Sequence, residues 1–302
     1  MTEGEFVADA IDRHPTPRRI LLATDLSGRC DRALDRALLL ADEWKAGLVV
    51  VHALEPQYQA AIEAEHALPS WRRRDPNRRI SVAERQVRED LLGRDVPFEV
   101  VIEEGEPAEI VLRVAEERGC DFIVTGTARN ETFGRFILGT TVDRLARRAS
   151  VPLLVVKARA GRPYSRIVVA TDFSDASRRA LEGVAELFPG RAVALLHGYR
   201  PAVANRISAS AADETDRRLA ADECAAFLAA ADLAPDFRRN LQSFIEQGEI
   251  AWIVNAYAED KGLDLLVIGA RGRNIVLDLL LGSTAEHLLR SAPCDVLVMR
   301  KS

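Results

Sequence analysis

The sequence contains the same pattern of residues twice, and this duplication limits the folds open to it. Residues 19–27 read Arg-Ile-Leu-Leu-Ala-Thr-Asp-Leu-Ser, and residues 166–174 read Arg-Ile-Val-Val-Ala-Thr-Asp-Phe-Ser, 147 positions later. From residue 103 onward the offset is 143, and it holds through the match of residues 139–141 with residues 282–284. A constant register over this stretch indicates two copies of one unit, the second shortened by four residues.

The duplication predicts two domains with a short connection. A chain of 302 residues suits about two domains at ~100–200 residues each. Gly161 and Pro163 interrupt both helix and strand between the copies. We therefore expect an N-terminal lead of residues 1–18, a first domain of residues 19–158, a linker of residues 159–165 and a second domain of residues 166–302. So short a linker predicts that the two domains pack against each other.

Within each copy, short apolar runs alternate with amphipathic segments. Helices are expected at Arg32–Trp44 and Glu109–Arg118 in the first copy. The apolar runs lack polar–apolar alternation, as is typical of parallel strands buried on both faces; they are Ile20–Thr24, Leu48–Ala53, Phe98–Ile102, Phe122–Gly126 and Leu153–Lys157. This order predicts an α/β fold of two tandem doubly wound domains, each with a five-stranded parallel sheet. Ligands bind such sheets at the carboxyl ends of the strands.

The loop after the fourth strand of the second copy carries the strongest chemical signal. Residues 269–272 read Gly-Ala-Arg-Gly, and after nine more residues Gly-Ser-Thr opens a helix expected over Ala285–Arg290. Gly269 permits a tight turn, and Gly272 lets backbone N–H groups approach an anion. The helix start offers unpaired N–H groups and two hydroxyls, which suit a triphosphate, and Arg273 adds positive charge. A simple N-cap is an equally good interpretation of the helix start, and the motif is not a P-loop.

The spacing Gly-x2-Gly-x9-Gly-Ser resembles the ATP-binding motif of the universal stress protein family. The Ala-Thr-Asp-Phe-Ser after the first strand is similar to that family's strand-end aspartate, and residues 292–299 resemble its last strand. The resemblance extends from Arg19 to Lys301 and implies Rossmann-like domains of the adenine-nucleotide α-hydrolase type. It implies ATP as the cofactor, alone or with Mg, and the following binding residues: Asp172, Gly198, Gly269, Arg271, Gly272, Gly282, Ser283 and Thr284.

The resemblance also implies a role for each of these positions. Asp172 is expected beside the ribose or the phosphate–metal region, and Gly198 is expected to offer backbone groups to the adenine. Gly269 and Gly272 are expected along the phosphates, which residues 282–284 hold. Asp172 is also a candidate metal ligand through Mg-ATP, and either Asp172 or Ser174 is a candidate N-cap of the next helix.

The first copy departs from the motif at one position. Arg129 stands where the second glycine is expected, so its side chain either blocks backbone approach or pairs with a phosphate. The other counterparts in the first copy are Asp25, Ala53, Gly126, Gly139, Thr140 and Thr141. We therefore predict a nucleotide-competent second domain and leave the ligand of the first domain open.

The favoured function is an ATP-binding stress-response regulator with little or no catalysis, at most slow ATP hydrolysis. The sequence has no Walker lysine, no identifiable arginine finger and no Ser-His-Asp pattern. His52 and His197 lie at equivalent strand ends and are interpreted as packed polar side chains. One alternative is a scaffold or carrier of a non-nucleotide, for example lipid-like, ligand, with segments Pro56–Leu91 and Pro201–Leu233 lining an apolar pocket. A nucleotidyl-transfer enzyme is a weaker alternative, because neither His-x-x-His nor Ser-Gly-Gly follows the first strand.

Composition indicates where the chain works and what it does not bind. The net charge of −5 favours a solvated segment over a nucleic-acid site at the Arg-rich residues 72–79. The N-terminal lead is polar, and no apolar run approaches the ~18 residues that a membrane span needs. Four scattered cysteines without metal spacing predict free thiols in a reducing, cytoplasmic compartment: Cys30, Cys120, Cys224 and Cys294.

Two features bear on assembly. The family resemblance implies that the last strands, Leu153–Lys157 and Val296–Arg300, pair within one chain, so that the tandem replaces a dimer. A further homodimer and a regulatory protein partner stay open. The segment Pro56–Asn77 has no counterpart in the second copy, and it is interpreted as a lid, a partner surface or, with a slight preference, a solvated insertion.

Overall fold

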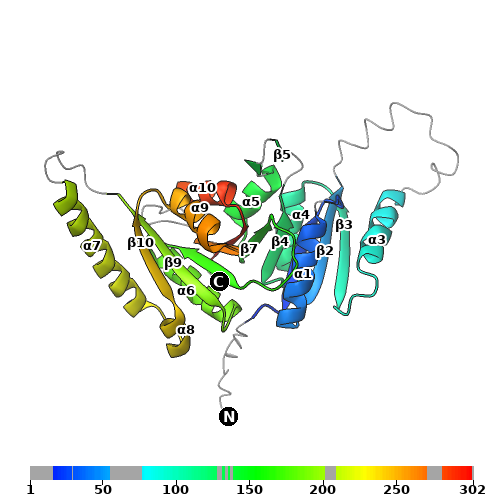
Figure 1. The fold of residues 1–302 in the computed structure, drawn as a ribbon. Helices are drawn as coiled ribbons and strands as arrows, with labels where there is room; N and C mark the ends of the chain where they lie inside the picture. The colour runs from blue at the N-terminus through cyan, green and yellow to red at the C-terminus, as the bar shows by residue number, and fades with distance from the viewer. Residues whose placement is uncertain are drawn as a thin grey trace, which may run out of the picture.

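The computed structural model places both copies in one α/β structure (Figure 1). It describes residues 16–28, 30–54, 77–127, 131–132, 135–136, 139–200, 209–270 and 281–300. The strands of the first copy are β1 (Arg19–Thr24), β2 (Gly47–Leu54), β3 (Phe98–Glu104), β4 (Phe122–Gly126) and β7 (Leu153–Val156). Its helices are α1 (Asp31–Trp44), α3 (Arg78–Asp90), α4 (Pro107–Glu117) and α5 (Thr140–Arg148). A small hairpin of β5 (Glu131–Thr132) and β6 (Arg135–Phe136) lies between β4 and α5.

The second copy repeats this order. Its strands are β8 (Arg166–Ala170), β9 (Ala192–Tyr199), β10 (Gln242–Gln247), β11 (Leu265–Gly269) and β12 (Asp295–Met299). Its helices are α6 (Asp175–Leu187), α7 (Ala209–Ala230), α8 (Pro235–Asn240), α9 (Ile250–Lys261) and α10 (Ser283–Ser291). The expected strands and helices are all present, with ends that differ by one or two residues from the sequence predictions.

The ten large strands form one continuous sheet in the order β10-β9-β8-β11-β12-β7-β4-β1-β2-β3. Within this sheet, every pairing between strands of the same copy is parallel, as predicted, and each half has the same strand order. The one antiparallel pairing of the ten-stranded sheet joins β7 to β12, with Leu154 opposite Leu297. The predicted pairing of the two last strands is therefore observed, and it joins the two halves edge to edge.

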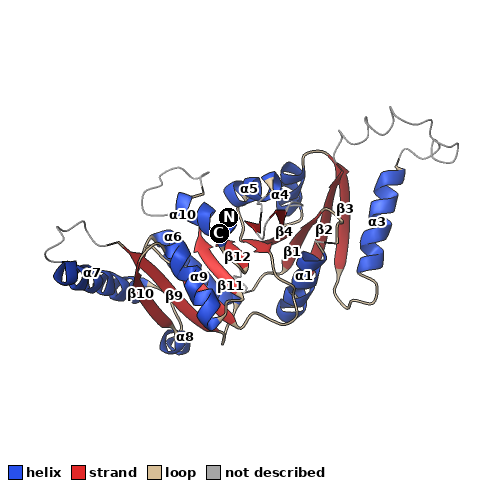
Figure 2. Ribbon diagram, turned by 45° about the horizontal axis from the view of Figure 1, so that its top comes forward, coloured by secondary structure: helices blue, strands red, loops and turns tan. Residues whose placement is uncertain are grey.

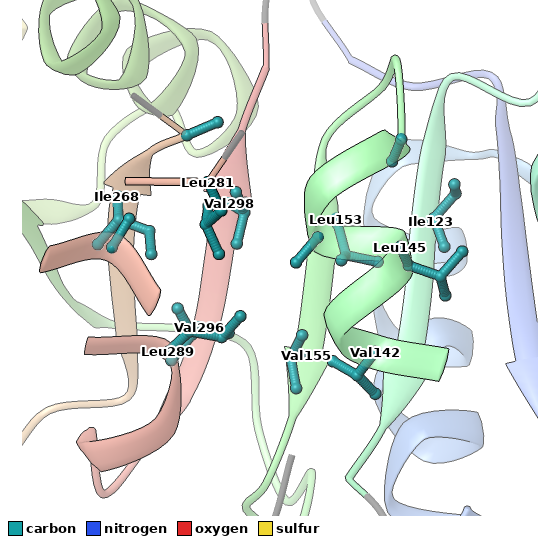
Figure 3. Close-up of a cluster of buried hydrophobic side chains, with 14 of the residues drawn as sticks. Ile123, Val142, Leu145, Leu153, Val155, Ile268, Leu281, Leu289, Val296 and Val298 are labelled. Atoms are coloured by element: carbon teal, nitrogen blue, oxygen red, sulfur yellow. The ribbon is translucent and has the colours of Figure 1, made fainter. Parts of the chain in front are cut away.

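Helices pack on both faces of this sheet (Figure 2). Successive strand residues point to opposite faces, so Ile20 and Leu22 join the core under α1 and α6, while Leu21 joins the core under α4, α5, α9 and α10. The second of these cores includes side chains from both sides of the β7–β12 seam, among them Leu153 and Val296, which Figure 3 labels. The halves therefore share a hydrophobic core on each face of the sheet.

A buried polar network fastens the same seam on the other face of the sheet. Asp295 is fully buried, and its carboxylate accepts hydrogen bonds from the backbone N–H groups of Lys157 and Ala158, both at 2.8 Å. The Tyr164 hydroxyl donates to Asp295 at 2.6 Å, and Nε of Arg36 lies 3.5 Å from the same carboxylate oxygen. The Arg36 guanidinium also stacks on the Tyr164 ring. These contacts connect α1, the connecting segment and β12.

Two buried cations lie in or beside this network. Arg36 has 4% of its surface exposed, and Lys157 has 1%. Burial lowers the pKa of Lys157 to about 8, while Nζ donates to the Ala292 carbonyl at 2.8 Å. Burial and the charge of Asp295 raise the pKa of Tyr164, which therefore keeps its proton for the hydrogen bond to Asp295. The sequence analysis did not anticipate this network.

Two other sequence predictions can be compared with the described residues. The four cysteines are free and buried, and burial raises the pKa of Cys30 and Cys120 to about 11 and that of Cys294 to about 12. Helices α3 and α7 lie at opposite ends of the sheet (Figure 1); Val87 of α3 and Phe227 of α7 pack in the core, whereas Val82 of α3 and Leu219 of α7 are exposed. They do not line a common apolar pocket. Most of the segment Pro56–Asn77 lies outside the described residues.

Candidate functional site

The predicted strand-end aspartate of the second copy sits in a tight turn between β8 and α6. Phe173 has φ = +59°, and its N–H donates to Oγ1 of Thr171 at 2.9 Å. The N–H of Ser174 donates to Oδ1 of Asp172 at 3.1 Å. Ser174 then serves as the N-cap of α6, accepting from the N–H of Ser177 at 3.3 Å. Of the two N-cap candidates, Ser174 is therefore the cap, and Asp172 shapes the turn before it.

The first copy builds the same turn. Leu26 has φ = +57° and donates to Oγ1 of Thr24 at 3.1 Å, while Ser27 donates to Oδ1 of Asp25 at 2.9 Å. A difference lies at Cys30, which stands where the second copy has Ser177. The Cys30 thiol lies 3.0 Å from Oδ1 of Asp25 and donates to it. The turn is therefore a shared property of both copies, whereas the surroundings of its carboxylate differ.

The two equivalent histidines are held by the same backbone contact. Nδ1 of His52 lies 2.9 Å from the Thr24 carbonyl, and Nδ1 of His197 lies 2.9 Å from the Thr171 carbonyl. Because a carbonyl only accepts, Nδ1 carries the hydrogen in both rings. His197 also stacks on Phe173 with ring centroids 4.1 Å apart. These contacts agree with the interpretation of both residues as packed polar side chains.

Gly269 is required by packing rather than by a turn. It does not adopt the left-handed conformation. A Cβ at Gly269 would lie 2.8 Å from the carbonyl carbon of Ala176 and 3.0 Å from the backbone nitrogen of Ser177, in the first turn of α6. The sequence explanation of this glycine as a turn residue was therefore wrong. At its counterpart Gly126, the nearest atom to such a Cβ is Sγ of Cys30, at 3.6 Å.

Gly198 is also set by a close approach. A Cβ there would lie 2.8 Å from the carbonyl oxygen of Gly248 and 3.2 Å from the backbone nitrogen of Ile250, at the start of α9. Gly248 has φ = +140°, a conformation that favours glycine. The first copy has Ala53 at the position of Gly198. The second copy thus brings the start of α9 close to the end of β9.

Helix α10 begins with an open N-terminus. Its N-cap, Gly282, has no side chain, and no side-chain hydrogen bond caps the helix. Ser283 and Thr284 form the first turn, and both are exposed. The first N–H groups of a helix lack intrahelical partners and carry the positive end of the dipole. This end of α10 can therefore bind an anion.

These elements surround a cleft of about 730 Å³ at the carboxyl ends of the strands. Its walls come from the ends of β8, β9 and β11 and from the first turns of α9 and α10. Six residues predicted from sequence line it together: Asp172, Gly198, Gly269, Gly282, Ser283 and Thr284. The predicted Arg271 and Gly272 lie outside the described residues. The cleft lies where the strand order reverses, on either side of β8.

Sequence reasoning missed several charged or titratable side chains of the cleft. Arg200, Glu249 and His287 also line it, and Nη2 of Arg200 lies 3.8 Å from Glu249. His287 follows Thr284 by three residues on a helix, a spacing that places both on one face and that would have identified it. Glu249 and Arg200 could not be found this way, because they come from different elements.

The first-copy candidates occupy corresponding places. Asp25 follows β1, Ala53 lies in β2, and Gly126 ends β4. Gly139 is the N-cap of α5, with φ = −67° against −62° for Gly282, and Thr140 and Thr141 form the first turn. Arg129 lies outside the described residues. Across the described ranges, no group of three or more His, Cys, Asp or Glu residues is placed to hold a metal, and no helix is both long and apolar enough to cross a membrane.

Two doubly wound parallel half-sheets, with a cleft at the carboxyl ends of the strands, define a tandem Rossmann-like α/β protein. The model of the universal stress protein family matches residues 16–157 and again residues 163–300. The chain therefore belongs to the universal stress protein family and carries its domain twice.

Individual relatives agree with this assignment. A universal stress protein of Mycolicibacterium smegmatis is 24% identical over an alignment covering 93% of this chain and 96% of the relative. A universal stress protein of Thermus aquaticus is 34% identical over 46% of this chain and 98% of its own length, so it corresponds to one domain. A putative universal stress protein from Pseudomonas aeruginosa has the same fold, with a TM-score of 0.65, 19% identity and coverage of 95% of this chain and 94% of its own.

Proposed function

We propose that the second domain binds an adenine nucleotide, ATP, in its cleft, and that the chain acts as a stress-response regulator with little or no catalysis. The observation that supports this is the meeting, in one cleft, of Asp172 with the open N-terminus of α10. In this proposal the N–H groups and hydroxyls of residues 282–284 hold phosphate oxygens. Gly198 lets the adenine approach the backbone at the end of β9.

The residues of the cleft fit a magnesium nucleotide. Mg²⁺ is usually held by one or two carboxylates together with substrate phosphates, and it demands no all-protein cage. Asp172 supplies one carboxylate beside the α10 N-terminus. When bound, the ion would neutralise phosphate charge, while Asp172 and the hydroxyls of Ser283 and Thr284 orient the phosphates. The same carboxylate suits a ribose hydroxyl in the absence of metal.

The proposal of a regulator is supported by the absence, from the sequence and from the described side chains of the cleft, of a known arrangement for rapid phosphoryl transfer. Such a transfer needs several charged groups aimed at the transferred phosphate. The sequence contains no Walker lysine, and both strand-end histidines use Nδ1 for a backbone carbonyl. Ligand binding between the first turns of α9 and α10 would instead change the surface that these helices present. We also propose that the chain acts in the cytoplasm.

The direct test is the recovery of ligand from the purified chain. We expect denaturation of protein purified without added nucleotide to release ATP, detected by mass spectrometry, and we expect the emptied protein to bind ATP in calorimetric titration. Incubation with labelled ATP should show turnover far below one per second. Release of a lipid, or a failure of ATP to bind, would overturn the proposal, and rapid turnover would overturn its non-catalytic part.

A carboxylate at Thr284 should separate phosphate binding from folding. The change Thr284→Asp puts negative charge at an exposed position in the first turn of α10, where it favours the helix through its dipole but repels phosphate. We expect ATP affinity to fall by about tenfold or more with no loss of thermal stability. The matched control is Thr141→Asp, at the same position of α5. Equal losses of ATP affinity in the two variants would contradict the assignment to the second domain.

A further inference from the structure

The two copies differ in how their last two helices are joined. In the first domain, Nη1 of Arg144 on α5 lies 2.9 Å from Oε1 of Glu106, the N-cap of α4. One turn further along α5, Arg148 forms a bidentate ion pair with Glu109 of α4, in which Nη2 and Oε2 lie 3.0 Å apart. Figures 1 and 2 both show α4 beside α5. Two ion pairs thus cross from the first turn of α4 to α5.

The Glu106 carboxylate contacts both helices, α4 and α5. Its Oε2 accepts the N–H of Glu109 at 2.9 Å and so caps α4, while its Oε1 pairs with Arg144. The carboxylate therefore occupies the start of α4 and faces α5 at the same time. In the second domain, the start of the equivalent helix α9 has no side-chain cap, although its N-cap is also a glutamate, Glu249.

The second domain has lost the partners needed for both pairs. At the constant offset of 143 positions, Arg144 is replaced by His287, and the Glu109–Arg148 pair by Trp252 and Ser291. Trp252 is 68% exposed, and the Ser291 hydroxyl donates to the His287 carbonyl at 2.9 Å. Glu249 faces Arg200 at 3.8 Å rather than α10.

One of these replacements, His287, lies in the wall of the cleft. Glu249 and His287, the counterparts of Glu106 and Arg144, both line the cleft of the second domain. A bond between those two positions would join the start of α9 to α10 across the wall of the cleft. We propose that the Arg144–Glu106 and Arg148–Glu109 pairs form a strap that holds the first domain's counterpart of the cleft closed. The absence of this strap then makes the second domain the ligand-binding copy, an inference that rests on the proposed function.

The strap favours the closed form of the cleft only modestly, so a ligand can still open it. The side chains of Arg144 and Glu106 are 52% and 38% exposed, and ion pairs at such exposure contribute modestly because water screens them. Transfer of both pairs to the second domain should therefore weaken ligand binding by about tenfold, a change within reach of two modest contacts that must break before the ligand enters.

The test transfers the strap to the second domain of the full chain. The variant Trp252→Glu, His287→Arg, Ser291→Arg restores the charges of the first domain around Glu249. The control Trp252→Gln, His287→Gln, Ser291→Gln removes the same native side chains without allowing an ion pair. Calorimetric titration with ATP should show about tenfold weaker binding by the strapped variant than by the control. Equal affinity, or tighter binding because an introduced guanidinium meets the phosphates directly, would overturn the strap.

A second measurement tests the strap without any nucleotide present. Hydrogen exchange without ligand should be slower at residues 249–256 and 283–291 in the strapped variant than in the control. Unchanged exchange there would overturn the strap. A wild-type chain that fails to bind ATP would overturn the proposed function alone, and the exchange comparison would still decide the strap.

Discussion

Replacing Asp295 with alanine is expected to lower the free energy of unfolding by about 3–5 kcal/mol, the cost of leaving buried charges without their partner. Asp295 is fully buried at the seam between the halves, where it accepts two backbone hydrogen bonds and one from Tyr164. Its removal leaves the buried Arg36 guanidinium without its carboxylate. It also removes a negative charge that favours the protonated form of the buried Lys157. Urea unfolding followed by circular dichroism and by tryptophan fluorescence measures the change.

Two further variants make this prediction specific to the seam. Tyr164→Phe removes a single 2.6 Å hydrogen bond to the carboxylate and should cost about 2 kcal/mol, which also provides a measurement if Asp295→Ala does not fold. Asp175→Ala removes an aspartate that is 78% exposed and pairs with Arg178, and it should change the free energy of unfolding by at most about 1 kcal/mol. The account of the network is wrong if Asp295→Ala is no more destabilising than Asp175→Ala.

Gly269→Ala is expected to destabilise the chain by about 1–3 kcal/mol, as overpacking against backbone does. The new Cβ would lie 2.8 Å from the carbonyl carbon of Ala176, in the first turn of α6, so α6 must move. The turn that holds Asp172 leads directly into α6. ATP affinity should therefore fall together with stability, as measured by thermal unfolding and by titration.

The duplication supplies a matched control at Gly126. The same substitution there brings a Cβ no closer than 3.6 Å to Sγ of Cys30, which is ordinary contact. Both substitutions restrict the unfolded chain equally, so the difference between them measures crowding in the folded state alone. We expect Gly126→Ala to change stability by less than about 0.5 kcal/mol. Two variants of equal stability would show that the approach of α6 to Gly269 is not tight.

Features that depend on neighbours along the chain were predictable. Apolar runs of five or so residues without alternation marked the buried parallel strands, because successive residues face the two helical layers in turn and both layers are apolar. Thr-Asp-Phe-Ser and Thr-Asp-Leu-Ser marked the end of the first strand of each copy, and in the second copy also the start of the next helix. Gly282, Ser283 and Thr284 marked a helix start. The carboxyl ends of parallel strands lie on one edge of a sheet, so these local features were also expected to share a cleft.

Features that depend on contacts distant in sequence were not predictable. Asp295 begins a strand, and nothing near it indicates burial beside Tyr164, which lies 131 positions away. Arg148 and Glu109 are 39 positions apart, and each looks like an ordinary charged residue of a solvated helix face. Gly269 was assigned the wrong reason, because the atom that excludes a side chain there belongs to α6 rather than to its own loop.

The sequence by itself thus determined that the chain carries one doubly wound α/β domain twice, since the hydrophobic pattern and the residues at strand ends and helix starts act over a few positions. The tertiary structure decided how the two copies are joined and how the contacts between their helices differ. It placed a buried carboxylate at the seam where the two half-sheets join. It also joined α4 and α5 of the first domain by two ion pairs whose residues are not all present at the equivalent positions of the second domain. Packing and charge pairing act between atoms close in space, and only the folded chain brings those atoms together.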